Sequence, residues 1–170
     1  MPSWIVGYVR FVDALNYRVG RFAMYLIYVL GAILMASTLS RLITGVAFNW
    51  ALEMSQFVLS AYYLLGGAYT WQQGQHVRMD LIYQNFSVRR RVTTDAITVL
   101  FVIFYLIVLF AGGVSSTNYA IVYKQTNYSA WAPVLWPIKI VMTVAIFLML
   151  LQAISSFFKD VAELRGKPIA

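Results

Sequence analysis

Four long apolar stretches, separated by short polar segments, run along this chain of 170 residues. They extend approximately over residues 22–43, 51–72, 94–116 and 135–158. Because about 20 apolar residues in a helix, each rising about 1.5 Å, cross the hydrocarbon core of a bilayer, each stretch is long enough for one membrane span. The pattern predicts an all-α integral membrane protein with four transmembrane helices and excludes a soluble fold.

The segment before the first span, residues 1–20, also carries a helical pattern. One predicted face collects the large apolar side chains Trp4, Ile5, Tyr8, Phe11, Val12 and Leu15. The polar residues Ser3, Arg10, Asp13 and Asn16 fall outside that face. Such a stripe predicts an N-terminal amphipathic helix lying in the cytoplasmic interface of the membrane, with Trp4 as an anchor. The alternative is that the stripe packs on protein. A cleavable signal is not expected, since the first span is too long for one.

Composition supports membrane placement and one domain over residues 1–170. Hydrophobic residues make up 61% of the chain, charged residues only 11%, and the mean hydropathy is +0.72. The net charge of +7 could indicate nucleic acid, but the basic residues lie between the apolar spans. There they meet lipid phosphates and set the orientation, which makes a nucleic-acid partner unnecessary.

The basic residues alternate strongly between the two predicted faces of the membrane. Ten of the 13 lie before span one, between spans two and three, or after span four, and among them Arg89, Arg90 and Arg91 are expected to anchor at the membrane surface. Only Arg41, Lys124 and Lys139 lie on the other face. Because basic segments resist translocation, we expect both termini and the loop over residues 74–91 to be cytoplasmic.

The residue types needed for cofactor or catalytic chemistry are scarce. The chain has no cysteine, and its single histidine, His76, lies outside the spans. Haem ligation, an iron–sulfur cluster and a Cys/His metal site are therefore not expected. Serine and threonine side chains within the spans can be satisfied by backbone carbonyls, so no nucleophilic site stands out. We expect no enzyme and no cofactor in this chain.

Two features of the second span invite closer reading. Glu53 lies near its start, close in sequence to Arg41 at the end of the first span, so the two charges are expected to pair. Alternatively, Glu53 is a coupling carboxylate of a self-contained small exporter or channel. Gly66 and Gly67 interrupt the same span with small side chains, which favours close approach of another helix.

The segment from Glu53 to Arg91 carries a recognisable signature. It reads Glu53-x-Ser55, then the pair Gly66-Gly67, then His76-Val77-Arg78-Met79-Asp80, and finally the basic run of residues 89–91. This signature, together with the length and the four spans, resembles the small membrane subunit of tripartite ATP-independent periplasmic (TRAP) transporters, the DctQ-like family.

That resemblance implies a non-catalytic scaffold in the bacterial inner membrane. Its expected partners are a much larger membrane subunit, which holds the substrate and sodium sites, and a periplasmic binding protein that delivers an organic anion such as a dicarboxylate or sialic acid. Arg41, Glu53, Gly66 and Gly67 would be structural or interface residues. His76, Arg78 and Asp80 would fix the inner loop; the alternative is that they form a solvated turn after the helix. The transported solute is not expected to be readable here, because the residues that select it lie on other chains.

Two other classes remain in view. A small oligomeric exporter or channel would use Glu53, whereas a membrane anchor for a redox complex is disfavoured by the missing histidines.

Overall fold

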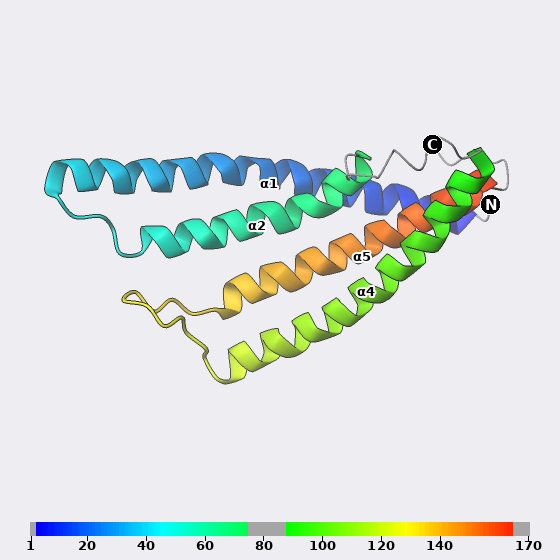
Figure 1. Cartoon of the computed structure of the whole chain (residues 1–170). Coiled ribbons are helices and arrows are strands. Elements are labelled where there is room, and N and C mark those ends of the chain that lie inside the picture. The colour runs from blue at the N-terminus through cyan, green and yellow to red at the C-terminus, as the bar shows by residue number, and fades with distance from the viewer. Residues whose placement is uncertain (1–2, 75–87, 165–170) are drawn as a thin grey trace.

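The computed structural model describes residues 3–74 and 88–164, with side chains placed for residues 4–74 and 93–163. The described residues form helices α1 (Ser3–Thr44), α2 (Ala51–Gln72), α4 (Val88–Val122) and α5 (Trp136–Leu164). Figure 1 shows them as two antiparallel hairpins, α1–α2 and α4–α5. The expected all-helical fold is confirmed for this part of the chain.

Helix α1 differs from the expected arrangement, because residues 3–44 form one continuous helix. A separate interfacial helix followed by a span is therefore not what the structure shows. The stretch between residues 16 and 22 contains no proline, and the cost of Gly20 is small against the packing of the surrounding turns. At about 1.5 Å per residue, this 42-residue helix is about 63 Å long, twice the thickness of a hydrocarbon core.

The predicted apolar stripe at the start of α1 is rotated in the structure. Ile5, Val9, Val12 and Asn16 are the buried positions, at a helical spacing of four, three and four residues. Phe11 and Trp4 are each 66% exposed, although Trp4 also makes an edge contact with Phe158 of α5. The buried stripe packs on protein, and the polar residue Asn16 lies on it rather than outside it.

The ends of the helices follow local sequence signals. Gly45, with φ +75°, closes α1 and donates its N–H to the Arg41 carbonyl at 3.0 Å, a left-handed C-terminal stop. Helix α5 begins at Trp136 with Pro137 in its first turn, where a missing N–H costs nothing, and this confirms the predicted start. Helix α2 coincides with the predicted second span, whereas α4 and α5 extend beyond theirs.

Within the described residues, three helical segments are long and apolar enough to cross a membrane: Trp4–Thr44, Thr93–Val122 and Trp136–Glu163. Helix α2 does not reach that hydropathy, because it carries Glu53, Gln56 and Gln72 among its 22 residues. The predicted number of four spans therefore goes beyond these three segments.

Helix α5 is the centre of the arrangement. It packs along α4, against α2, and against the N-terminal part of α1 (Figure 1). A small core of Leu106, Ile146 and Ala153 fills the α4–α5 seam, and Trp71 of α2 packs against it. The two hairpins meet near the start of α1 and the end of α5. The connections α1–α2 and α4–α5 lie at the opposite end of the molecule and stand apart from each other (Figure 1).

Candidate functional site

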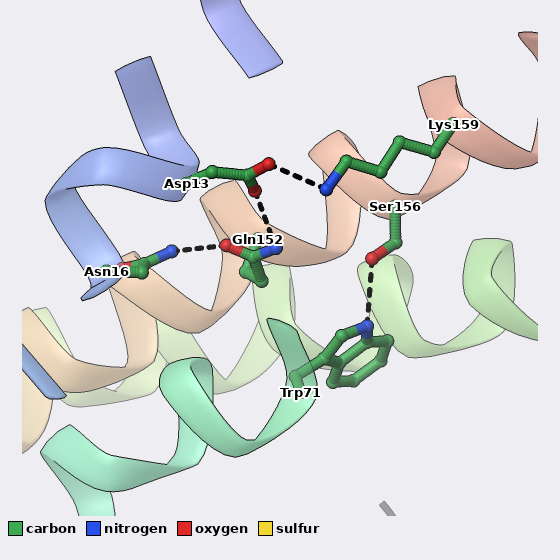
Figure 2. A network of polar contacts seen from close by, with 6 residues as sticks. All are labelled: Asp13, Asn16, Trp71, Gln152, Ser156 and Lys159. Carbon is green, nitrogen blue, oxygen red and sulfur yellow. Dashed lines mark hydrogen bonds and ion pairs between the residues drawn. The ribbon is translucent and has the colours of Figure 1, made fainter. Parts of the chain in front are cut away.

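The main polar feature of the fold is a set of side chains that joins the two hairpins, which we call the polar junction (Figure 2). Its members come from three helices: Asp13 and Asn16 of α1, Trp71 of α2, and Gln152, Ser156 and Lys159 of α5. Helix geometry brings them together because residues 152, 156 and 159 of α5 follow at spacings of four and three and share one face.

Gln152 is the centre of the polar junction and is only 1% exposed. Its Oε1 accepts a hydrogen bond of 2.6 Å from Asn16 Nδ2, and its Nε2 donates one of 3.1 Å to Asp13 Oδ1. An ionised carboxylate can only accept, so the amide must present its nitrogen to Asp13 and its oxygen to Asn16. Each polar group of this amide thus has a partner on α1.

The remaining contacts extend the junction in both directions. Lys159 Nζ lies 2.7 Å from Asp13 Oδ2, an ion pair in which both side chains are partly buried. Trp71 donates its indole N–H to Ser156 Oγ at 2.9 Å, which joins α2 to α5. Tyr8 adds a bond of 3.2 Å to the Leu151 carbonyl. The junction is therefore a chain of contacts that fixes α1 and α2 onto α5, and its charges neutralise one another.

Glu53 and Arg41 are not brought together as expected. Glu53, in the first turn of α2, is 8% exposed, and its Oε2 accepts no hydrogen bond from any described residue. Arg41 is exposed in the last turn of α1, and no ion pair between the two is found in the described part of the chain. A long arginine side chain can keep its guanidinium in a polar layer without desolvation, which removes the incentive to pair.

The two glycines of α2 have different surroundings. A Cβ built on Gly67 would lie 3.7 Å from Met149 Sδ of α5, an ordinary packing distance, whereas one on Gly66 would meet nothing within 4 Å. Gly67 therefore packs inside this chain, and Gly66 faces outward. The structural roles expected for both glycines stay predictions.

The other expected site residues divide between the described and undescribed parts of the chain. His76, Arg78 and Asp80 lie outside the described residues. Arg89, Arg90 and Arg91 belong to the first turn of α4, but their side chains are outside the described set. Anchoring by Trp4 stays a prediction, although its exposed ring suits it.

Sequence reasoning missed most of the polar junction. Gln152 and Ser156 lie within the fourth apolar stretch, and a polar amide inside such a stretch is itself a signal of an interhelical contact. Gly20 was also missed: a Cβ there would overlap the side chain of Tyr69, so the absence of a side chain at residue 20 lets Tyr69 of α2 lie against α1. Its position within a predicted helix was the available signal.

The contacts of the polar junction hold α1 and α2 against α5. No group of three or more acidic, histidine or cysteine side chains that could hold a metal occurs among the described residues. Both oxygens of Asp13 are engaged, one by Lys159 and one by Gln152.

Comparison with protein-family models matched residues 30–163 to the family described as "Tripartite ATP-independent periplasmic transporters, DctQ component". The match covers more than half of the chain and includes Trp71, Gln152, Ser156 and Lys159 of the polar junction, while Asp13 and Asn16 precede it. No similar chain was found among curated proteins or among solved structures.

Proposed function

Because the chain belongs to the DctQ component family of the tripartite ATP-independent periplasmic (TRAP) transporters, we propose that it is the small, non-catalytic membrane subunit of such a transporter. In this role it holds the large membrane subunit in place during sodium-coupled uptake of an organic anion, such as a dicarboxylate or sialic acid. A periplasmic binding protein delivers that anion, and the large subunit carries the substrate and sodium sites.

The observation that carries this proposal is that the polar side chains of α1 and α5 bond to each other and hold the two hairpins together. Asp13 of α1 accepts from both Gln152 and Lys159 of α5, and these contacts support a frame that is held together at the polar junction. A transporter that moves one body against another needs such a stationary frame. The frame also presents large apolar faces on α1 and α4, including Tyr28 and Phe104, that suit lipid or a membrane partner.

The same proposal includes four membrane crossings and cytoplasmic termini in the bacterial inner membrane. Helix α2 is about 33 Å long at about 1.5 Å per residue, which is sufficient to cross, and it packs between α1 and α5. Its polar residues are tolerable because part of its surface faces protein. The distribution of basic residues, ten of 13 on one predicted face, supports the orientation.

One observation favours a second candidate. Glu53 is a buried carboxylate whose Oε2 has no bonding partner among the described residues. In a self-contained exporter or channel this oxygen would bind a proton or a cation. In the TRAP subunit it would receive a donor from the large subunit.

Reconstitution separates the two candidates. We expect vesicles containing this chain alone to take up no organic anion under a sodium gradient, whereas vesicles with both membrane subunits and loaded binding protein take it up. Transport by this chain alone would overturn the proposal. Glu53→Gln should reduce co-purification of the large subunit without changing the sodium dependence of uptake, and Gln56→Ala, an exposed neighbour, is the matched control.

A further inference from the structure

A groove with a volume of about 360 Å³ lies between α4 and α5, away from the polar junction. Most of its lining is apolar, and the residues that matter here are Tyr105, Leu109 and Gly112 of α4 and Lys139, Met142 and Ile146 of α5. The core residues Leu106 and Ile146 close the seam between the two helices at its inner end.

Two glycines create the groove. Gly113 faces α5, where a Cβ would lie 3.2 Å from Thr143 Oγ1, so the helices approach closely along this line. Gly112 faces outward, and a Cβ built there would meet nothing within 4 Å. The missing side chain at residue 112 is therefore what leaves the surface hollow, since the neighbouring positions Val108 and Ser116 stand on either side of it.

One end of the groove carries a positive charge that is held in place. Lys139 Nζ donates to Ser116 Oγ at 3.0 Å and to Gln125 Oε1 at 2.8 Å, both neutral acceptors. Gln125 is itself held by its backbone, because the Leu135 N–H donates to the Gln125 backbone carbonyl at 2.9 Å. No acidic side chain pairs with Lys139 in the two described ranges. The ammonium is thus oriented but not neutralised.

The dimensions of the groove match one leaflet of a membrane. Between Thr117 and Tyr105, its two limits on α4, the helix rises about 18 Å, whereas half of a hydrocarbon core is about 15 Å. An apolar partner helix in this groove would bury the Lys139 charge without a counterion. A second pocket at the same end of the hairpin is lined by Lys124 and Trp136, a combination typical of the headgroup layer.

We propose that this groove binds one anionic phospholipid, with its phosphate on Lys139 and one acyl chain lying past Gly112 toward Tyr105. The inference rests on the membrane placement of α4 and α5 within the proposed function, but it does not depend on the identity of the transported solute. Such a lipid would fill the hollow that the two glycines leave and supply the anion that Lys139 lacks.

Photo-crosslinking tests the site in the full chain. The probe is phosphatidylglycerol with a diazirine on one acyl chain, present as a minor component of phosphatidylcholine vesicles, and the crosslinked peptides are mapped by mass spectrometry. We expect the probe to label residues 105–117 and 139–146 in preference to the apolar face of α1. Even labelling of all exposed helix faces would overturn the proposal.

Two variants address the two ends of the ligand separately. Lys139→Gln should reduce labelling by phosphatidylglycerol about fivefold and labelling by a phosphatidylcholine probe by less, because both lipids carry the phosphate but only phosphatidylglycerol has a net charge. Lys139→Arg should rescue the labelling. Gly112→Leu should abolish labelling by both probes, because leucine fills the groove. Arg41→Gln, which removes a cation outside the groove, and Ala111→Leu, which enlarges a neighbouring exposed residue, are the matched controls.

The remaining outcomes are equally informative. Unchanged labelling in Lys139→Gln and Gly112→Leu, with native thermal stability, would overturn the site. If Gly112→Leu does not fold, the lysine variants decide alone. A photoreactive phenylalanine at residue 112 in the complex with the large subunit should capture lipid, and capture of the large subunit would overturn the proposal. Absence of uptake in reconstituted vesicles would count against the transporter role and not against this site, because labelling needs no transport.

Discussion

At the scale of single residues, Gln152 decides how the two hairpins are held. Its amide is buried in a long apolar helix and bonds to both Asp13 and Asn16. In a membrane the net value of one interhelical hydrogen bond is small, about 0.6 kcal/mol on average, but a buried polar group left without a partner costs about 1–3 kcal/mol. The penalty for breaking the contact thus exceeds the gain from making it.

Replacement of Gln152 by leucine tests this balance. Gln152→Leu keeps the volume but leaves Asn16 Nδ2 without its acceptor, so we expect a loss of about 1–2 kcal/mol of stability. The measurement is thermal or denaturant unfolding of the full chain in mild detergent. Gln56→Leu, on an exposed position of α2, is the control and should change little. Equal stability of both variants would show that the polar junction does not fasten the hairpins.

Gly20 provides the second residue-scale prediction. Any side chain there would overlap Tyr69, whereas Gly31 has open space around it. We expect Gly20→Leu to destabilise the α1–α2 hairpin by about 1–3 kcal/mol through overpacking, and Gly31→Leu to be tolerated. Unfolding in detergent measures both. Removal of the whole neighbouring side chain, in the pair Gly20→Ala with Tyr69→Gly, should cost less than the sum of the two single changes, because the nearest atom to a Cβ at residue 20 is Tyr69 Cβ, which alanine would keep. Simple additivity of the two changes would contradict this contact.

Sequence reasoning failed where the position of a polar residue depends on a partner that the sequence does not identify. Periodicity located a stripe at the start of α1, but it assigned Asn16 to the polar side because an amide is usually exposed. Its burial depends on Gln152, which lies 136 positions away in the chain. Arg41 and Glu53, neighbours across a short connection, were expected to pair and are not paired by any described contact. Sequence distance is thus a weak guide to polar partners.

At the scale of elements, the continuity of α1 differs from the sequence-based prediction of a separate interfacial helix over residues 1–20. Spin labels on cysteines replacing Ala14 and Ala32, both exposed, should report a narrow distance distribution near about 27 Å, because 18 residues of one helix rise by about 1.5 Å each. Pulsed electron–electron double resonance on the full chain in lipid nanodiscs provides the measurement. A short or broad distribution would mean that an interfacial helix separates from the span in a membrane.

Element boundaries were predictable where a local stop signal exists. Helix α2 matched its prediction at both ends, and α5 began at Trp136 as the two prolines indicated. Helix α4 continues to Val122, six residues past the predicted span, because hydropathy marks where an apolar stretch ends and not where a helix ends. The family expected from the segment Glu53 to Arg91 is confirmed by the match over residues 30–163.

At the scale of the whole molecule, the orientation in the membrane remains to be measured. The chain has no cysteine, so single cysteines at Gln73 and Thr126, both exposed, can be labelled selectively. The asymmetry of basic residues predicts that residue 73 lies in the cytoplasm and residue 126 in the periplasm. A membrane-impermeant maleimide added to intact spheroplasts should label only residue 126. Labelling of both would exclude the four-span topology.

The pairing of helices into hairpins could be predicted, but the packing of one hairpin against the other could not. The short connection between α1 and α2 leaves only an antiparallel neighbour, and the turn over residues 123–135 does the same for α4 and α5. The polar side chains of α5 indicate an interhelical contact, but nothing local identifies α1 and α2 as the partners. That arrangement depends on Trp71, Gln152 and Lys159, whose partners lie on the other hairpin.

Fastening at one end and separation at the other make each hairpin a lever arm. The α1–α2 tip lies about 30 Å from Trp71 along α2, so a rotation of roughly 5° about the fastened end displaces that tip by about 3 Å. A force applied at a tip therefore produces a large torque about the polar junction, whereas the same force applied near Gln152 produces almost no torque. A partner that grips both tips (Figure 1) therefore sets the opening angle of the subunit with a much smaller force than one that binds beside the polar junction.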